Sequence, residues 1–334
     1  MVRLAINGFG RIGRAAFKVA LEEPQIEVVA INDLGDIENL AYLLRYDTVY
    51  GRYARPVLVE ENALVVGDKR VVVLGGPDPR TLPWGKLNVD VVIESTGVFT
   101  EARRARGHLE AGAKRVIISA PSEGEGVSTV LVGVNDGELV GKDIISNASC
   151  TTNSVGPVMA VLHAVFGVEK ALLTTVHAYT ATQSLVDGPA KKDFRRGRAA
   201  AANMVPSSTG AAIATTRALP VLTDKFDGVA LRVPLTTVSI SDITALLQKE
   251  VTVEVVNQAF KDAVDNPTYK GVLGVTEDPV VSSDFIGDPR SAIVDLAATR
   301  VVGSTLVKVM AWYDNEWGYS NRLIEQAVAF GKQL

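Results

Sequence analysis

The sequence predicts an α/β protein with two domains: a doubly wound parallel sheet, then an α+β domain whose sheet is mostly antiparallel. Short β-branched runs alternate with helix-like segments over the first 150 residues, which is typical of a doubly wound sheet. Beyond Cys150 the β runs alternate apolar with polar residues, as in a sheet with one covered face. The length of 334 residues also exceeds what one hydrophobic core usually supports.

The predicted strands of the first half are short and rich in apolar residues, so we expect both of their faces to be buried. They are residues 2–7, 26–32, 89–95, 115–119 and 143–147. Helix-like segments at 11–23 and 101–114 lie between them.

The second half begins with a helical stretch at about 151–166. Long alternating runs at 229–234, 238–249 and 306–314 are expected to form the second sheet. Residues 179–203 are irregular and rich in Gly, Pro and basic residues. A loop of this length inside a compact chain is usually functional or an interface arm.

Composition and charge predict a soluble globular protein. Hydrophobic residues make up 47% and charged residues 22% of the chain, and the net charge is −4. The pI of about 5.6 argues against a nucleic acid as the primary partner. The single cysteine cannot form an intrachain disulfide, which fits a reducing compartment.

We expect neither a targeting segment nor a membrane span in this sequence. The N-terminus lacks the charged, apolar and cleavage regions of a signal peptide. Residues 144–168 carry no charged side chain, but Pro157, His163 and several polar residues interrupt them, whereas a span needs about 20 mostly apolar residues. We therefore expect a cytoplasmic protein with no membrane partner.

Gly8, Gly10 and Gly13 have the G-x-G-x-x-G spacing of a dinucleotide-binding turn. They follow an apolar strand and open a helix, where backbone N–H groups can meet a pyrophosphate. Asp33 ends the second strand, twenty residues beyond Gly13, and a carboxylate there favours NAD over NADP. The alternative is a structural turn with Asp33 as a helix cap. The small polar segment 95–97, at the end of another strand, is either part of this site or a plain turn.

Cys150 stands in NASCTTN, just before an apolar helical run. If Ser149 caps that helix, Cys150 lies in its first turn, where the helix dipole favours a thiolate. Backbone amides and the hydroxyls of Thr151 and Thr152 could hold an anion there. The alternative is a small buried hydrophobe at a helix start.

A nucleophilic cysteine needs a base, and the chain offers three histidines. His108 lies in a charged helical segment and is expected to face solvent. His163 is expected to be half-buried in a helix. His177 follows an apolar run at a strand end, where catalytic groups commonly sit, and is the best candidate.

Three segments could bind anions. Residues 191–198 hold five basic residues in eight, and could be a solvated face, a phosphate clamp or an interface. Ser207, Ser208, Thr209 and Gly210 precede a helical stretch and form a plausible oxyanion cradle. Arg232 interrupts an apolar run, where a charge is costly unless it is paired or binds an anion. A nicotinamide cofactor with a thiol nucleophile suggests aldehyde oxidation through a thioester.

Several distinctive segments follow one another along the whole chain. They are INGFGRIGR, IND, ESTGVF, SNASCTTN, TTVHAYT, DGPAKKDFRRGR, PSSTGAA, LRVP and WYDNEWGYSNR. In this order they resemble the phosphorylating glyceraldehyde-3-phosphate dehydrogenases, and the cysteine segment and WYDNEWGYS are particularly specific to that family.

The resemblance implies oxidation of glyceraldehyde 3-phosphate to 1,3-bisphosphoglycerate with NAD and inorganic phosphate, and no metal. Cys150 would attack the aldehyde, and His177 would remove its proton and assist hydride transfer. Phosphate would then release the thioester. The implied phosphate-binding residues are Thr180 and Arg232 for the substrate, Ser149, Thr151, Thr209 and Gly210 for the attacking phosphate, and Arg196 between the two.

For the cofactor, the resemblance implies that Asp33 holds the adenosine ribose and Asn315 the nicotinamide carboxamide. The remaining implied cofactor residues are Gly8, Gly10, Arg11, Ile12, Gly13, Thr96, Ser119 and Tyr319.

The resemblance also implies a domain plan and an assembly. Residues 1–148 would form an NAD-binding Rossmann domain, with the C-terminal helix 315–334 packing on it, and residues 149–314 would form the catalytic domain. The protein would be a homotetramer in which the 179–203 loop lies beside a neighbour's cofactor site.

Two positions depart from the family pattern. Ile213 stands where the family usually has lysine, which puts local packing or an ion pair near the phosphate site in doubt. Ser154 stands where many members have a second cysteine, so Cys150 is the only thiol.

Three other functions remain open at this stage. An erythrose-4-phosphate dehydrogenase would share the cofactor, cysteine and histidine, although Thr180 in HAYT favours the triose phosphate. The basic cluster 191–198 could indicate a regulatory or nucleic-acid-binding protein, against the acidic pI. A non-phosphorylating aldehyde dehydrogenase would use water as acyl acceptor, against the anion-binding SSTG and SCTT segments.

Overall fold

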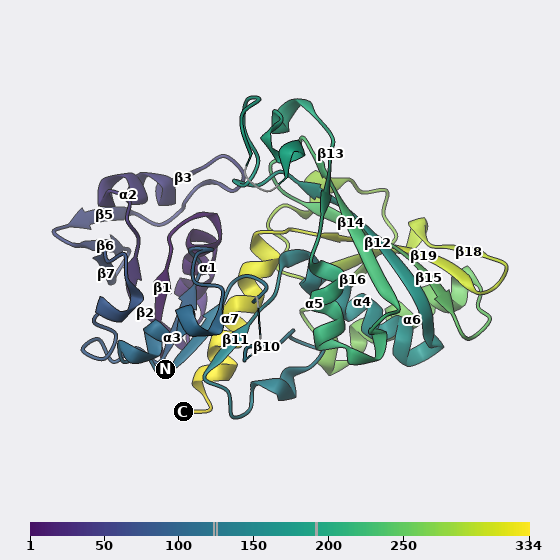
Figure 1. Cartoon of the computed structure of the whole chain (residues 1–334), viewed down its shortest axis with the longest axis horizontal. Helices are drawn as coiled ribbons and strands as arrows, with labels where there is room; N and C mark the ends of the chain where they lie inside the picture. The colour runs from purple at the N-terminus through teal and green to yellow at the C-terminus, as the bar shows by residue number, and fades with distance from the viewer. Residues whose placement is uncertain (123, 125, 191–192) are drawn as a thin grey trace. The chain divides into compact units, whose positions relative to one another are not determined.

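The computed structural model describes residues 1–122, 124, 126–190 and 193–334, and its chain divides into two compact units (Figure 1). The first unit comprises Met1–Val132, Asp136–Ala148 and Ser320–Leu334. The second comprises Gly133–Asn135 and Ser149–Tyr319. Each unit is built around its own sheet.

The sheet of the first unit, in the part of the chain described, has the strand order β10-β11-β9-β8-β1-β2-β7-β6-β5. All pairs from β10 to β7 are parallel, and only β7–β6 and β6–β5 are antiparallel. The strands are β1 Val2–Asn7, β2 Ile26–Asn32, β5 Val57–Glu60, β6 Ala63–Val66, β7 Lys69–Leu74, β8 Val91–Glu94, β9 Arg115–Ile118, β10 Ser128–Thr129 and β11 Ile144–Ser146. The predicted doubly wound sheet is confirmed, and β8 is buried along its whole length, as predicted for these strands.

Three helices follow strands of this unit: α1 (Arg11–Glu22), α2 (Ile37–Arg45) and α3 (Ala102–Glu110). The first and third confirm the predicted helices, although α3 ends four residues early. The short pair β3 (Tyr46–Asp47) and β4 (Gly51–Arg52) lies outside the main sheet.

The second unit has the strand order β13-β14-β12-β15-β19-β17-β16, with β18 paired to β19. The pairs β12–β14 and β16–β17 are parallel, and the other pairs are antiparallel, which confirms a mostly antiparallel sheet. The strands are β12 Val168–Ala178, β13 Val205–Ser208, β14 Phe226–Val233, β15 Ser239–Leu247, β16 Leu273–Thr276, β17 Ala292–Asp295, β18 Arg300–Val302 and β19 Leu306–Tyr313.

Helices α4 (Cys150–Phe166), α5 (Ala211–Ala218) and α6 (Val253–Asp265) belong to the second unit. Burial alternates strictly along β15, because one face of the sheet packs under these helices. Figure 1 shows α4, α5 and α6 beside the long strands of this sheet. The core joins apolar side chains of α4 and α6 to those of β12, β15 and β19.

The last helix, α7 (Trp317–Gly331), begins in the second unit and continues in the first. Within the first unit, Gln326 Nε2 donates to the carbonyl oxygen of Val130 at 2.7 Å. The Arg115 guanidinium lies 5.4 Å from the centre of the Phe330 ring. In the described part of the chain, every helix is too short or too polar to cross a membrane.

Candidate active site

The glycine-rich turn joins β1 to α1, and each glycine has its own role. Gly8 has a φ of 95°, and a Cβ there would lie 2.6 Å from the backbone N of Thr96. A Cβ at Gly13 would lie 2.0 Å from the carbonyl oxygen of Gly8. Gly10 precedes α1, and a Cβ there would meet nothing within 4 Å. The open space at Gly10 fits a diphosphate that accepts hydrogen bonds from the helix N-terminus.

Asp33 lies directly after β2, and its carboxylate supports the turn. Oδ2 accepts a hydrogen bond from the Phe9 N–H at 2.7 Å, and Oδ1 accepts one from Gly35 at 2.8 Å. Each oxygen keeps a further lone pair that could accept a ribose hydroxyl. The alternative reading as a helix cap is wrong, because Asp36 caps α2.

The other cofactor candidates of the first unit lie near the carboxyl ends of its parallel strands, where α/β proteins bind ligands. Thr96 is exposed after β8, and half-buried Ser119 follows β9. Arg11 and Ile12 form the first turn of α1. The Arg11 guanidinium pairs with Asp47 at 2.8 Å, so it is already engaged by a carboxylate.

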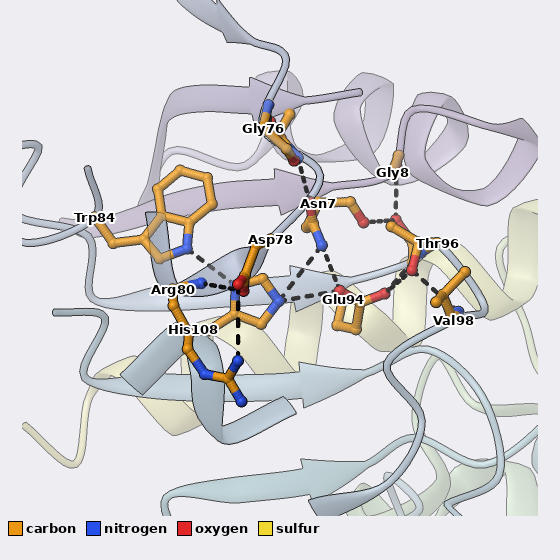
Figure 2. A network of polar contacts seen from close by, with 12 residues as sticks. Asn7, Gly8, Gly76, Asp78, Arg80, Trp84, Glu94, Thr96, Val98 and His108 are labelled. Carbon is orange, nitrogen blue, oxygen red and sulfur yellow. Dashed lines mark hydrogen bonds and ion pairs between the residues drawn. The ribbon is translucent and has the colours of Figure 1, made fainter. Parts of the chain in front are cut away.

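The predicted solvent exposure of His108 is wrong, because its side chain is fully buried. Its Nε2 lies 3.0 Å from Glu94 Oε2, and its Nδ1 lies 3.0 Å from the indole nitrogen of Trp84 (Figure 2). The prediction failed because the arginines of α3 make the segment look polar, although its inner face buries Ala105, Gly107 and His108. His163 is half-buried near the end of α4, as predicted.

Cys150 is the first residue of α4, and Ser149 is the N-cap, as predicted. Ser149 Oγ accepts a hydrogen bond from the Thr152 N–H at 3.1 Å. Cys150 Sγ lies 3.4 Å from Nε2 of His177, which is near the end of β12. A thiol and an imidazole at this distance have the geometry that a nucleophile and its base require.

Burial controls the protonation of this pair. It raises the pKa of the half-buried Cys150 thiol, while the charge of Arg232 and hydrogen bonding with Thr151 lower it. Burial, followed by the charge of Arg232, lowers the pKa of His177 to about 3. The free pair is therefore a thiol beside a neutral imidazole, and burial outweighs the thiolate preference predicted from the helix start.

Arg232 lies directly beside His177, because the two residues are register partners on β14 and β12. Its guanidinium Nη1 donates to the carbonyl oxygen of Ala178 at 3.0 Å and lies 2.6 Å from His177 Nδ1. His177 Nδ1 is also 2.6 Å from the same carbonyl oxygen. The tautomer sets the role of Nδ1. With the proton on Nδ1, it donates to Ala178 and Nε2 can accept the proton of Cys150; without it, Nδ1 accepts from Arg232.

A buried tyrosine that the sequence analysis did not select joins the two halves of the pair. The hydroxyl of Tyr313 lies 2.9 Å from Thr151 Oγ1 and 2.9 Å from Thr175 Oγ1. Thr151 follows the nucleophile on α4, and Thr175 precedes the base on β12. Burial raises the pKa of Tyr313, and ionisation of Cys150 would raise it further, so Tyr313 remains a neutral phenol. Its place in the WYDNEWGYS segment was the available signal.

The remaining phosphate candidates hydrogen-bond within their own segments. Thr180 Oγ1 lies 2.9 Å from Thr182 Oγ1, and Thr209 Oγ1 accepts from the Ala211 N–H at 3.1 Å. Gly210 is the N-cap of α5.

The Arg196 guanidinium is held by the predicted oxyanion segment. Its Nε and Nη2 donate to Ser207 Oγ at 2.9 and 2.7 Å. Burial is the main influence that lowers the pKa of Arg232, and the nearby charge of Arg196 lowers it further. Lys191 and Lys192 of the basic cluster lie outside the described residues. Two cations near one another favour an anionic ligand.

The cofactor candidates Asn315 and Tyr319 belong to the second unit and are buried. Asn315 Oδ1 accepts a hydrogen bond from Ser239 Oγ at 2.9 Å. This contact fixes the orientation of the Asn315 amide and hence the direction of its NH2 group. In the described ranges, no group of three His, Cys, Asp or Glu side chains could hold a metal ion.

The two departures from the family pattern have plain structural outcomes. Ile213 is 59% exposed on α5, so no core packing depends on it. Ser154 is buried in α4, and its Oγ lies 3.1 Å from Ser241 Oγ.

Two family models match this chain. The NAD binding domain of glyceraldehyde 3-phosphate dehydrogenase matches residues 2–102, and the C-terminal domain of the same family matches residues 149–315. The second match contains both the cysteine and the histidine of the pair described above.

Curated relatives are similar over the whole chain. Glyceraldehyde-3-phosphate dehydrogenase 2 of Streptomyces arenae is 51% identical over 336 residues, covering 100% of this chain and 99% of that protein. The enzyme of Mycolicibacterium smegmatis is 50% identical with the same coverage. That of Bacteroides fragilis is 49% identical and covers 98% of both chains.

Proposed function

Because the chain belongs to the glyceraldehyde-3-phosphate dehydrogenase family, we propose that it oxidises glyceraldehyde 3-phosphate with NAD and inorganic phosphate to 1,3-bisphosphoglycerate, as a step of glycolysis or gluconeogenesis. The observation that carries the chemistry is the 3.4 Å contact between Cys150 Sγ and His177 Nε2. Of the alternatives raised by the sequence, a nucleic-acid-binding role rests on the basic cluster 191–198, and the acidic pI of about 5.6 opposes it.

The first step adds the thiol of Cys150 to the aldehyde carbon. His177 Nε2 takes the Sγ proton as the S–C bond forms, and the proton returns to the aldehyde oxygen, which gives a hemithioacetal. His177 then removes the hydroxyl proton while the carbon loses a hydride, and a thioester remains on Cys150. When bound, NAD supplies the hydride acceptor.

Inorganic phosphate completes the reaction by attacking the thioester carbonyl. The C–S bond breaks, the acyl phosphate leaves, and Cys150 regains its proton. Arg232 and Thr180 would hold the phosphate of the substrate. Ser149, Thr151, Thr209 and Gly210 would hold the attacking phosphate, with Arg196 between the two. The positive charges of Arg196 and Arg232 support anion binding in this unit.

NAD would be held chiefly by the first unit. The open face of Gly10, the helix start at Arg11 and Ile12, and Asp33 after β2 support this assignment. The other proposed cofactor residues are Gly8, Gly13, Thr96, Ser119, Asn315 and Tyr319.

We propose that residues 1–148 with 315–334 act as the cofactor domain and residues 149–314 as the catalytic domain. The protein would work in the cytoplasm as a homotetramer, with the 179–203 loop at a subunit interface. Exposed apolar side chains on the outer face of the second sheet, such as Leu172 and Val229, support an assembly.

The test measures NADH formation from glyceraldehyde 3-phosphate with and without inorganic phosphate, for the native chain and Cys150→Ser. Phosphate-dependent turnover that vanishes in Cys150→Ser is expected. Turnover that ignores phosphate would indicate water as the acyl acceptor. Higher catalytic efficiency with erythrose 4-phosphate would change the substrate, and full activity without the thiol would refute the mechanism.

A further inference from the structure

A buried carboxylate lies at the carboxyl end of β8 and takes no part in the mechanism above. Glu94 is 2% exposed. Its Oε1 accepts from the N–H of Thr96 at 2.9 Å and from the Thr96 hydroxyl. Its Oε2 accepts from Asn7 Nδ2 at 2.5 Å and faces His108 Nε2 at 3.0 Å. Figure 2 shows these side chains converging on Glu94.

The proton of His108 can be placed from its neighbours. Trp84 Nε1 is only a donor, so His108 Nδ1, at 3.0 Å, must accept. In the neutral ring the proton is then on Nε2, which donates to Glu94. Trp84 thus orients the imidazole from behind, and the fully buried side chains of both residues hold that orientation.

Hydrogen bonds from two neighbouring strands also fix the orientation of the Asn7 amide. Gly76 N–H donates to Asn32 Oδ1 at 2.8 Å, and Asn32 Nδ2 donates to the Gly76 carbonyl at 3.0 Å. Asn32 Nδ2 also donates to Asn7 Oδ1 at 2.7 Å. This leaves the Asn7 amide with its NH2 toward Glu94, where only an acceptor is compatible. The Glu94 carboxylate therefore gives an acceptor to both Asn7 Nδ2 and His108 Nε2.

These contacts bear directly on the glycine-rich turn. Asn7 is the last residue of β1, and Gly8 follows it. Ser95 Oγ donates to the Gly8 carbonyl at 2.7 Å, and the residue after it, Thr96, is held by Glu94. The turn and the segment 95–96 touch, since a Cβ on Gly8 would lie 2.6 Å from the Thr96 nitrogen.

We propose that Glu94 and His108 are positioning residues of the dinucleotide site. Together they set the end of β1 and the segment after β8, so that the turn is formed before NAD binds. The inference rests on the proposed NAD-dependent function. A preorganised site loses less entropy on binding, so disruption should weaken NAD binding without altering the Cys150–His177 pair.

The experiment compares full-length Glu94→Gln, His108→Leu and His108→Gln with the native protein. Titration calorimetry gives the Kd for NAD, and steady-state kinetics gives kcat and the KM for NAD. We expect Glu94→Gln and His108→Leu to raise the Kd and KM for NAD about tenfold. Glu94→Gln places an amide NH2 group among donors, and His108→Leu leaves the buried Trp84 Nε1–H without its acceptor. His108→Gln keeps an N–H toward Glu94 and should stay within about twofold of native. The kcat should be unchanged in all three.

Val116→Ala is the matched control, because it creates a cavity in the same sheet outside the network. It should lower the melting temperature yet leave the Kd for NAD within about twofold of native. A Kd that follows melting temperature across all variants would overturn the proposal, and so would equal NAD affinity of His108→Leu and His108→Gln. If Glu94→Gln fails to fold, the two His108 variants decide. Failure of the native protein to bind NAD would instead refute the proposed function.

Discussion

Cys150, His177 and Arg232 lie together, and the charge of Arg232 acts on the pKa of the other two groups. Arg232 lowers the pKa of both Cys150 and His177, although burial is the largest influence on each. Burial favours the neutral forms of both the thiol and the imidazole, so we expect the proton to pass from Cys150 to His177 only as the thiol attacks the substrate. The charge of Arg232 is therefore a control on the nucleophile as well as a candidate anion ligand.

Replacement of that charge gives a first prediction. In Arg232→Gln the pKa of Cys150 should rise, because a nearby positive charge no longer stabilises the thiolate. Iodoacetamide alkylation should be slower at pH 7, and its pH profile should move to higher pH. Arg300→Gln, on exposed β18, is the control and should keep the native profile. An unchanged profile in Arg232→Gln would contradict the electrostatic account.

His177 also links stability to pH. Its pKa in the folded protein is about 3, below the ordinary 6.5, so the unfolded chain binds this proton more readily. The associated stability is complete above about pH 6.5 and is lost as pH falls toward the folded pKa. Between pH 7 and 4.5, His177→Asn should therefore lose less free energy of unfolding than the native protein. Urea unfolding at a series of pH values measures this, and parallel curves would refute it.

Helix starts are the clearest link between residue and element. Ser149 caps α4 and places Cys150 in its first turn, while Asp36 caps α2 with bonds from Glu38 and Asn39 N–H groups at 3.0 and 3.1 Å. The Ser149 cap positions Cys150, the proposed nucleophile, and the Asp36 cap supports α2 alone. The two can be separated by experiment, because α2 lies in the first unit.

Asp36→Ala should destabilise the protein by about 1 kcal/mol, since two N–H groups lose their acceptor. Asp36→Asn retains a capping oxygen and should cost only a few tenths of that. Chemical unfolding measures both, and the rate of Cys150 alkylation should not change in either. Equal stability of the alanine and asparagine variants would show that the cap contributes nothing.

At the scale of the whole molecule, three large apolar side chains are exposed on the outer face of the second sheet. Leu172, Val229 and Leu306 are 66%, 55% and 41% exposed. Register places Leu172 and Val229 on the same face of β12 and β14. Such a surface is typical of a protein–protein contact, which agrees with the proposed homotetramer.

Leu172→Glu should therefore shift the assembly to smaller species, because a carboxylate in an apolar contact is not solvated. Sedimentation velocity distinguishes a particle of four 35.5 kDa chains from smaller forms. Leu58→Glu is the control, since Leu58 is 56% exposed on β5 of the first unit. A native protein that sediments as a monomer would refute the assembly itself.

Local patterns predicted much of the fold. The five strands of the first half and helices α1 and α4 lie where apolar runs, glycine spacing and capping residues indicated. Helix α6 and the hairpin strands β5 and β6 were not predicted. Strands β5 and β6 have four residues each, which leaves little length for a periodic pattern. The structure places three candidate residues, Cys150, His177 and Arg232, beside one another, which the sequence could not establish. Their catalytic and binding roles stay predictions.

By itself, the sequence determined the family, the glycine turn, the helix start at Cys150 and the choice of His177, because each is a local signal carried by residue type and spacing. Only the tertiary structure decided that His108 is buried against Glu94 and that Tyr313 bridges Thr151 to Thr175. These contacts join residues far apart in the chain, and burial changes what each side chain can do. The pKa values of Cys150 and His177 likewise follow from desolvation and a neighbouring charge, which the order of residues does not specify.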